Sequence, residues 1–137
     1  MSSVKTVFTN GCFDILHLGH ISLLKFCRSL GDVVIVGINS DESVKRLKGP
    51  GRPVNGQEER KIFLESIRYV DEVHIFHEDT PFELISQIRP DIIVKGGDYR
   101  PEDVVGNNLA KVVIFETVDG FSTTKKIKDI SDRRRLY

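Results

Sequence analysis

The sequence has no tryptophan, one methionine and two cysteines among its 137 residues. The N-terminal segment MSSVKTVFTN lacks the apolar stretch of a signal peptide, and no apolar run approaches the roughly 18 residues needed to cross a bilayer. We therefore expect a cytoplasmic protein with no membrane partner. Cys12 and Cys27 could pair in principle, but a chain without an export signal works in a reducing compartment, so both are expected to be free thiols, with Cys27 in the core.

An excess of charge of either sign is also absent, because 20 basic side chains balance 20 acidic ones. Such a chain has no net field that would favour nucleic acid as its partner, and we expect none. The length fits one domain with a real core and leaves no room for a second catalytic module. We expect a single domain over residues 1–137, of which residues 131–137 form a tail.

Four apolar, β-branched runs and one weaker run predict the strands of a sheet. Stretches with helical periodicity lie between them. This alternation predicts an α/β fold, namely a Rossmann-like, mostly parallel sheet with helices on both faces. The five predicted strands are Val4–Thr9, Val33–Ile38, Glu72–Phe76, Ile92–Val94 and Val112–Phe115.

Three of the intervening stretches predict helices, and a fourth helix is expected to start at residues 122–124. The first is Ile21–Leu30, which Gly31 ends. The second begins near Asn55, where Asn55 and Glu58 have capping-box spacing, and its predicted buried stripe is Phe63, Leu64, Ile67 and Val70. The third opens with Thr80 as N-cap, Pro81 and Glu83, and its predicted apolar face is Phe82, Ile85 and Ile88.

Ligands of parallel sheets bind beyond the carboxyl ends of the strands. Polar segments that follow a predicted strand are therefore candidate walls of a site. The sequence has four of them: Asn10–His20, Asn39–Asn55, Lys95–Gly106 and Thr117–Thr124.

The first of these segments, NGCFDILHLGH, joins a strand to a helix, so that backbone amides and a helix N-terminus converge on one spot that favours phosphate. His17 and His20 lie three residues apart, where both imidazoles can face the same way and Gly19 leaves room for a phosphate. Two alternatives stay open at this point: an exposed pair without a function, or a zinc site completed by Cys12. No G-x-G-x-x-G follows the first strand, and no G-x-x-x-x-G-K-[ST] occurs in the chain.

The remaining segments carry cations, glycines and hydroxyls. Lys45, Arg46, Lys48 and Arg52 form a basic cluster, which either stays solvated or meets phosphate charge. The segment VKGGDY places two glycines after a buried strand, where the backbone can approach a ligand closely.

Within VKGGDY, Asp98 could hold a ribose, a base or Mg²⁺, or could simply cap a helix, and Tyr99 could stack on a ring or bond a sugar. In the last segment, Ser122, Thr123 and Thr124 either form a second anion site at a helix N-terminus or act as caps alone.

GCFDILHLGH resembles the G-x-F-D-x-x-H-x-G-H signature of the cytidylyltransferase-like nucleotidylyltransferases. The resemblance implies that His17 and His20 contact a triphosphate and stabilise the charge that develops on its α-phosphate, while Phe13, Asp14 and Gly19 shape the loop. Class I aminoacyl-tRNA synthetases share a related histidine signature, but this chain has no room for tRNA-binding domains.

Within that superfamily, the segments NSD, RLKG, RPVN, EDTP, VKGGDYRPEDVVG and GFSTT resemble the D-glycero-β-D-manno-heptose 1-phosphate adenylyltransferases over roughly residues 5–130. VKGGDY separates the chain from the glycerol-3-phosphate cytidylyltransferases and favours ATP as donor. IRYVDEV and the short connection Asn107–Lys111 are less typical of the heptose enzymes, so CTP with glycerol 3-phosphate stays the alternative. A non-catalytic nucleotide-binding regulator is a further alternative, but its expected mark, a broken histidine pair or a lost STT, is absent.

The resemblance further implies a stand-alone adenylyltransferase, a homodimer, that joins ATP to a phosphorylated sugar or polyol and releases pyrophosphate without a covalent enzyme intermediate. Mg²⁺ would enter with ATP, bound through triphosphate oxygens without a direct protein ligand. The implied catalytic residues are His17, His20, Lys48, Arg60 and Thr123. The implied nucleotide-binding residues add Asn10, Gly11, Cys12, Phe13, Asp14, Gly19, Lys95, Gly96, Asp98, Gly120, Ser122 and Thr124. The implied acceptor-binding residues are Asp14, Asp41, Lys45, Lys48, Tyr99 and Arg68, the last of which could instead form an ion pair or a subunit contact.

Overall fold

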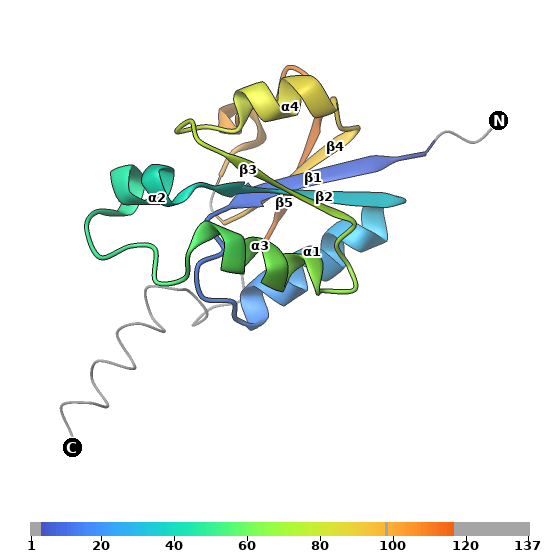
Figure 1. The fold of residues 1–137 in the computed structure, drawn as a ribbon. Helices are drawn as coiled ribbons and strands as arrows, with labels where there is room; N and C mark the ends of the chain where they lie inside the picture. The colour runs from blue at the N-terminus through green and yellow to red at the C-terminus, as the bar shows by residue number, and fades with distance from the viewer. Residues whose placement is uncertain (1–3, 98, 117–137) are drawn as a thin grey trace.

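The computed structural model describes residues 4–97 and 99–116, which form a five-stranded sheet with helices packed against it (Figure 1). All neighbouring strands pair in parallel, in the order β3-β2-β1-β4-β5. The predicted Rossmann-like α/β fold is confirmed. Along the chain the elements are β1 (Thr6–Gly11), α1 (Leu18–Leu30), β2 (Val33–Asn39), α2 (Asp41–Lys48), α3 (Gln57–Glu65), β3 (Glu72–Phe76), α4 (Phe82–Ile88), β4 (Ile92–Gly96), the 3-10 helix η1 (Pro101–Asp103) and β5 (Lys111–Phe115).

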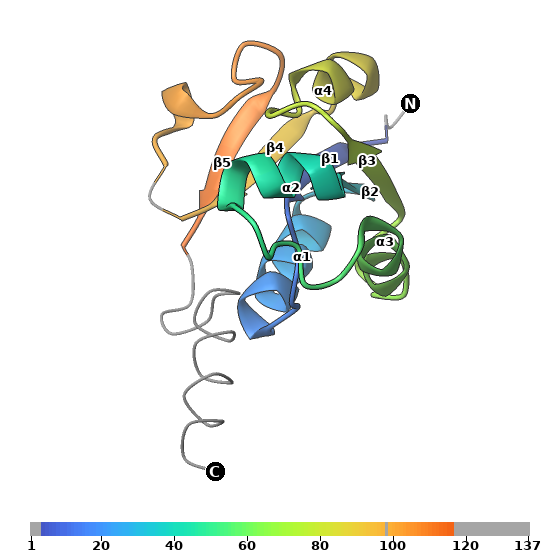
Figure 2. The ribbon, with the colours of Figure 1, turned by 60° about the vertical axis from the view of Figure 1, so that its left-hand side comes forward.

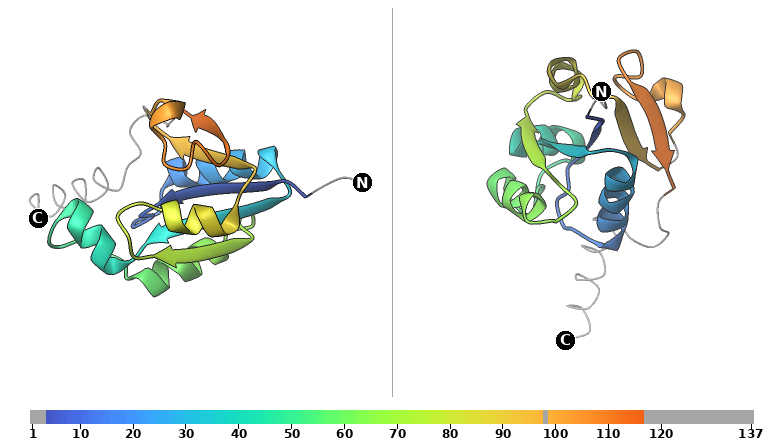
Figure 3. Two further views of the ribbon diagram at one scale, coloured as in Figure 1. Left: turned by 90° about the horizontal axis from the view of Figure 1, so that it is seen from above. Right: turned by 90° about the vertical axis from the view of Figure 1, so that its right-hand side faces the viewer.

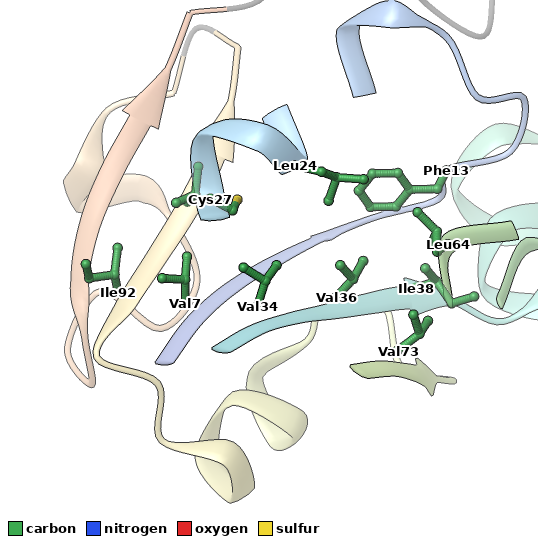
Figure 4. Packing of buried hydrophobic residues seen from close by; sticks show 11 residues of the cluster. Val7, Phe13, Leu24, Cys27, Val34, Val36, Ile38, Leu64, Val73 and Ile92 are labelled. Atoms are coloured by element: carbon green, nitrogen blue, oxygen red, sulfur yellow. The ribbon is translucent and has the colours of Figure 1, made fainter. Parts of the chain in front are cut away.

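Side chains that alternate along each strand divide between two cores, one on each face of the sheet. Val7, Val34 and Ile92 face the first core, where Leu24 and Cys27 of α1 and Leu64 of α3 pack against them (Figure 4). Phe8 and Ile93 face the second core and meet Ile85 of α4 and Val104, which follows η1. Figure 3 shows α1 and α3 on one side of the sheet and α4 on the other. The buried free thiol predicted at Cys27 is confirmed.

The predicted strands are all present, with ends shifted by up to two residues. The runs Val33–Ile38 in β2 and Ile92–Val94 in β4 carry no polar side chain, because a strand covered on both faces has no solvent side. The first predicted helix is also present, but it begins at Leu18, three residues earlier than Ile21, and Gly31 is its C-cap as expected.

The other helices differ from the prediction. Helix α2 lies in a segment that we expected to be a loop. Helix α3 starts after Gly56, which has no side-chain cap bond, and Phe63 is 45 % exposed, so the predicted stripe was wrong at that position. Ile67 and Val70 do reach the first core, but from the connection beyond the helix.

Helix α4 also begins differently, because Pro81 rather than Thr80 occupies the N-cap position. In its predicted apolar face Phe82 is 42 % exposed, whereas Ile85 is buried. The expected helix at residues 122–124 and the expected tail 131–137 lie outside the described residues. Over residues 4–97 and 99–116, no helix has the length and apolar character needed to cross a membrane.

The order of the strands predicts a ligand-binding crevice at the carboxyl ends of the strands. From β1 the chain moves outward through β2 to β3, and it then returns to the other side of β1 for β4 and β5. Ligands of such sheets bind where the two directions separate, at the carboxyl ends of the strands. Here that point is the junction of β1 and β4. Helix α2 lies across the carboxyl ends of the strands (Figure 2).

Candidate active site

His17 and His20 stand where the loop after β1 enters α1, as predicted. His17 is the N-cap of α1, and its Nδ1 accepts the backbone N–H of Gly19 at 3.1 Å. The backbone N–H of His17 in turn donates to Nδ1 of His20 at 3.2 Å. The two rings stack, with 3.8 Å between their centroids and 26° between their planes. The pair therefore has one fixed orientation, set by a capping box made of histidines.

These two bonds also decide which nitrogen carries the proton. Because each Nδ1 accepts a backbone N–H, the neutral form of each ring carries its proton on Nε2. Burial, followed by the nearby His17, lowers the pKa of His20 to about 4. His20 is therefore neutral at pH 7 and offers an N–H donor at Nε2 that does not depend on protonation of the ring.

Phe13 and Gly11 shape the turn that brings the histidines into place. Phe13 is buried and has φ of 48°, an unusual left-handed backbone for a bulky residue. Its ring lies 5.0 Å from that of His20. A Cβ on Gly11 would lie 3.2 Å from Cε2 of Phe13, so a larger residue at position 11 would crowd that ring. The local sequence GCF thus fixes the start of the phosphate loop.

A pocket of about 330 Å³ opens beside this loop at the carboxyl ends of β1, β2 and β4. It is lined by Asn10, Gly11, Cys12, Asn39, Leu47, Lys48, Asp79, Thr80, Pro81, Lys95, Tyr99, Asp103, Val104 and Val105. Among the described residues His17 and His20 do not line it. The segment Asn10–Cys12 is therefore the border between the pocket and the histidine loop.

Two lysines give the pocket a cationic side. Lys48 projects from the last turn of α2, and Lys95 stands near the end of β4. Burial lowers the pKa of Lys95, and the nitrogen lies 5.0 Å from the centroid of the Tyr99 ring. Carboxylates, amides, hydroxyls and a few apolar side chains form the rest of the lining. Ammonium groups bind phosphate, whereas carboxylates and amides bind hydroxyls, so the chemistry of this pocket fits a phosphorylated polyol or sugar.

Asp14, which the resemblance implies both shapes the loop and contacts the substrates, is bonded to a neighbouring loop. Its side chain is buried and accepts the backbone N–H groups of Val54 at 2.8 Å and Asn55 at 2.8 Å. Nε of Arg52 donates to the same carboxylate at 3.0 Å. Asp14 thus holds the loop at residues 52–55, and its expected direct contact with nucleotide or acceptor stays a prediction. Nη2 of Arg52 is buried and has no hydrogen-bond partner within the part of the chain described.

Arg60 is likewise placed away from the expected phosphate contact. Its side chain has no exposed surface. It donates hydrogen bonds to backbone carbonyls and to the carboxylate of Asp41, and so is occupied by the protein itself. Asp41, expected to contact the acceptor, is its ion-pair partner at 2.9 Å.

The other expected site residues lie in the pocket, elsewhere on the protein, or outside the described residues. Asn10, Gly11, Cys12, Lys48, Lys95 and Tyr99 line the pocket, and Gly96 ends the neighbouring strand β4. Lys45 is exposed on α2 outside the pocket lining. Arg68 lies between α3 and the amino end of β3, on the opposite edge of the sheet, where it donates to the Tyr69 hydroxyl at 3.0 Å. Asp98, Gly120, Ser122, Thr123 and Thr124 lie outside the described residues.

Several pocket residues were not named as site residues by the sequence analysis, although Asn39 and Asp103 lie in two of the segments predicted to form its walls. Asn39, Asp79, Thr80 and Asp103 all line the pocket. The segment that contains Asp79 and Thr80 follows β3, so the rule that placed site walls after strands applied to it as well. We had interpreted Thr80 as a helix cap alone. Within residues 4–97 and 99–116, no group of three or more histidines, cysteines and carboxylates is close enough together to hold a metal ion.

Comparison with known proteins shows what the chain is similar to. The model of the cytidylyltransferase-like family matches residues 8–133. Among curated proteins, the bifunctional protein HldE of Campylobacter jejuni (strain RM1221) is 56% identical over 131 residues, which cover 95% of this chain and 28% of the relative. HldE of a Nitratiruptor species is 59% identical over 121 residues, 88% of this chain and 26% of the relative. The chain thus spans about a quarter of the length of these relatives.

A solved structure is similar over most of the chain. The lipopolysaccharide core biosynthesis protein of Thermoplasma volcanium GSS1 aligns with a TM-score of 0.73 and 29% sequence identity. The alignment covers 85% of this chain and 100% of the other.

Proposed function

The chain belongs to the cytidylyltransferase-like family of nucleotidyltransferases, and from this membership we propose that it transfers AMP from ATP to D-glycero-β-D-manno-heptose 1-phosphate, giving ADP-heptose and pyrophosphate. The observation that carries the proposal is the pair of fixed imidazole donors beside a pocket with two lysines. The relatives named HldE and the lipopolysaccharide core protein support a sugar phosphate as acceptor and lipopolysaccharide synthesis as its destination.

The proposed arrangement gives each half of the site one substrate. The triphosphate lies at the histidine loop, where Nε2–H of His17 and His20 donates to phosphate oxygens and α1 directs its N-terminus at them. The acceptor lies in the pocket, its phosphate held by Lys48 and Lys95. The two substrates meet at Asn10–Cys12, the border that both halves share.

In the proposed reaction an oxygen of the acceptor phosphate attacks the α-phosphorus of ATP in line. The bond between the α-phosphorus and the oxygen that bridges to the β-phosphate breaks, and pyrophosphate leaves with that oxygen. No side chain forms a covalent bond. The chain contributes position and charge stabilisation, which are the main means of catalysis in transfer to phosphorus. Thr123, outside the described residues, is proposed to assist at the phosphates.

Mg²⁺ is proposed to enter with ATP. The ion is proposed to be bound by phosphate oxygens and water, as is usual for Mg²⁺ with nucleotides. When bound it neutralises part of the triphosphate charge. Because ATP is its donor, the enzyme is proposed to act in the cytoplasm.

A homodimer is also proposed, on the family resemblance. Light scattering at micromolar concentration measures the mass directly, and a monomer at all concentrations would remove the proposal. The second activity implied by the word bifunctional in the relatives' names is not proposed, because the chain spans only about a quarter of them.

The choice of donor and acceptor is tested with a panel. Pyrophosphate release is measured with ATP or CTP against heptose 1-phosphate, glycerol 3-phosphate and other sugar phosphates. We expect ATP with heptose 1-phosphate to be the best pair, and ATP to raise the melting temperature more than CTP, since a ligand stabilises by its affinity for the folded state. Preference for CTP with glycerol 3-phosphate, the alternative favoured by IRYVDEV, would overturn the substrate assignment.

A further inference from the structure

Helix α2 carries Lys48 into the pocket, yet its own packing against the protein is weak. Of its eight residues only Ser43 and Val44 are buried, and Leu47 is 52 % exposed. A short helix with one buried apolar side chain is not held in place by burial of apolar surface. Another group must fix where Lys48 stands.

Arg60 supplies such a group. Its Nε donates to the carbonyl oxygen of Asn55 at 2.9 Å, and its Nη2 donates to Oδ1 of Asp41 at 2.9 Å. Asp41 is the first residue of α2, and Asn55 lies near the end of the connection to α3. One buried guanidinium thus holds both ends of the segment that bears Lys48.

The same guanidinium anchors that segment to the rest of the site. Nη1 of Arg60 donates to the carbonyl oxygens of Cys12 at 2.8 Å and Asn39 at 2.7 Å. Cys12 and Asn39 follow or end the central strands β1 and β2, and both line the pocket. A planar guanidinium with five donors can serve four acceptors at once, whereas the ammonium of a lysine has three donors on one atom.

Other polar contacts of α2 also restrain it. The hydroxyl of buried Ser43 donates to the carbonyl oxygen of Glu78 at 3.0 Å and accepts a side-chain amide N–H at 3.0 Å, both near the start of the helix. Arg46 pairs with Asp79 at 2.9 Å, but the two side chains are 48% and 64% exposed. Pairs in that setting are screened by water and contribute little. Arg60, by contrast, is shielded from water completely.

We propose that Arg60 is a positioning residue for the reaction: it acts through α2, and sets the place of Lys48 in the acceptor pocket, without touching either substrate. This inference rests on the proposed function for its kinetic part. Its structural part, the restraint of α2 by Arg60, is independent of any activity.

The test compares Arg60→Lys with Arg28→Met. Arg28 is a matched control because it also bonds a carboxylate, that of Asp71, and a backbone carbonyl, that of Asp32. These contacts lie at the amino ends of the strands, on the side of the sheet away from the pocket. For Arg60→Lys we expect the KM of the acceptor to rise by roughly tenfold or more, while the KM of ATP changes by less than about twofold. Arg28→Met should change neither KM, even if it lowers the melting temperature.

A double variant separates positioning from independent action. If Arg60 acts through Lys48, then Arg60→Lys adds less than about twofold to the acceptor KM of Lys48→Ala, because residues in one pathway are not additive. The inference would be overturned if the rises in acceptor KM of the two single variants multiply in the double variant. It would also be overturned if Arg60→Lys raises only the KM of ATP or has wild-type kinetics.

Hydrogen exchange gives a readout that needs no turnover. The amides of Val44 and Gly49, bonded within α2 at 2.9 Å and 2.9 Å, should exchange faster in Arg60→Lys than in wild type or Arg28→Met, with α1 unchanged. Should Arg60→Lys fail to fold, Asp41→Ala removes the partly exposed partner alone and is expected to show the same acceleration. Unchanged exchange would overturn the restraint, whereas a wild-type protein without pyrophosphate release would overturn the proposed function and leave the exchange result standing.

Discussion

His17 and His20 each use their two ring nitrogens for different tasks. Nδ1 accepts a backbone N–H and builds the start of α1, and Nε2–H is the donor that we propose for phosphate. The capping task and the proposed catalytic task can therefore be separated by mutation, because asparagine places an acceptor near the position of Nδ1 and has nothing at Nε2.

His17→Asn is expected to keep the cap and lose the reaction. Turnover should fall by at least about a hundredfold, the scale of a lost transition-state donor, while the melting temperature stays near that of wild type. His17→Ala should show the same kinetic loss and in addition lose about 1 kcal/mol of unfolding free energy, since alanine cannot cap. Pyrophosphate release and thermal unfolding of the two variants provide the measurements. Near-normal turnover in folded His17→Asn would contradict the role of Nε2.

The lowered pKa of His20 predicts a loss of stability in acid. The pKa falls from an ordinary 6.5 to about 4 on folding, so between these values the unfolded chain binds more protons than the folded one. The free energy of unfolding should therefore decrease as the pH falls from about 6.5 to about 4, by an amount of the order of 2 to 3 kcal/mol. Urea unfolding across this range measures the change. In His20→Asn this part of the pH dependence should be absent, and an identical profile in both proteins would refute the assignment.

Single residues also mark what the sequence could not reveal. The histidine pair was predictable because both partners lie within one short motif at a strand-to-helix junction. Arg60 and Asp14 were not, because their partners lie up to 48 and 41 residues away and are mostly backbone groups, which have no sequence signature. We interpreted Arg60 as a phosphate contact, and Asp14 both as a ligand contact and as a residue that shapes the loop. The structure shows that both side chains are buried and bonded to backbone groups of the surrounding loops.

At the scale of elements, the strength of the apolar pattern separates the confirmed predictions from the missed ones. The strands contain β-branched apolar runs, which in β2 and β4 are largely buried, and they were found. Helix α2 was missed because DESVKRLK has one buried apolar residue, Val44, and no stripe. In α3 the pattern was present but misassigned, since Ile67 and Val70 contact the core from beyond Glu65, the last residue of the helix.

The orientation of α3 can be tested with neighbouring residues. Leu64 is completely buried, whereas Phe63 is 45 % exposed. Leu64→Ala should cost about 2 to 5 kcal/mol of unfolding free energy, as expected for a core leucine. Phe63→Ala should cost less than about 1 kcal/mol, although it removes the larger side chain. Urea unfolding of the two variants measures both losses, and a loss in Phe63→Ala as large as that in Leu64→Ala would restore the stripe expected from the sequence, in which both residues are buried.

At the scale of the whole molecule, the order β3-β2-β1-β4-β5 is what assembles the site. It brings the carboxyl ends of β1, β2 and β4 together, so that Cys12, Asn39 and Lys95 meet around one pocket although they are far apart in the chain. The alternation of strands and helices predicted the edge at which the site would lie. It could not predict that α2 would stand across that edge, because this depends on the contacts of Arg60.

The transfer itself is tested most directly by following radioactive phosphorus. ATP labelled at the α-phosphate is mixed with heptose 1-phosphate and an excess of enzyme, and the products are separated in a single turnover. The account predicts that the label appears in ADP-heptose, and that with ATP labelled at the γ-phosphate it appears in pyrophosphate. Three results would contradict the account. The γ-phosphate label could appear on the sugar, the α-phosphate label could become covalently bound to the protein, or the label could stay in ATP with every acceptor tested.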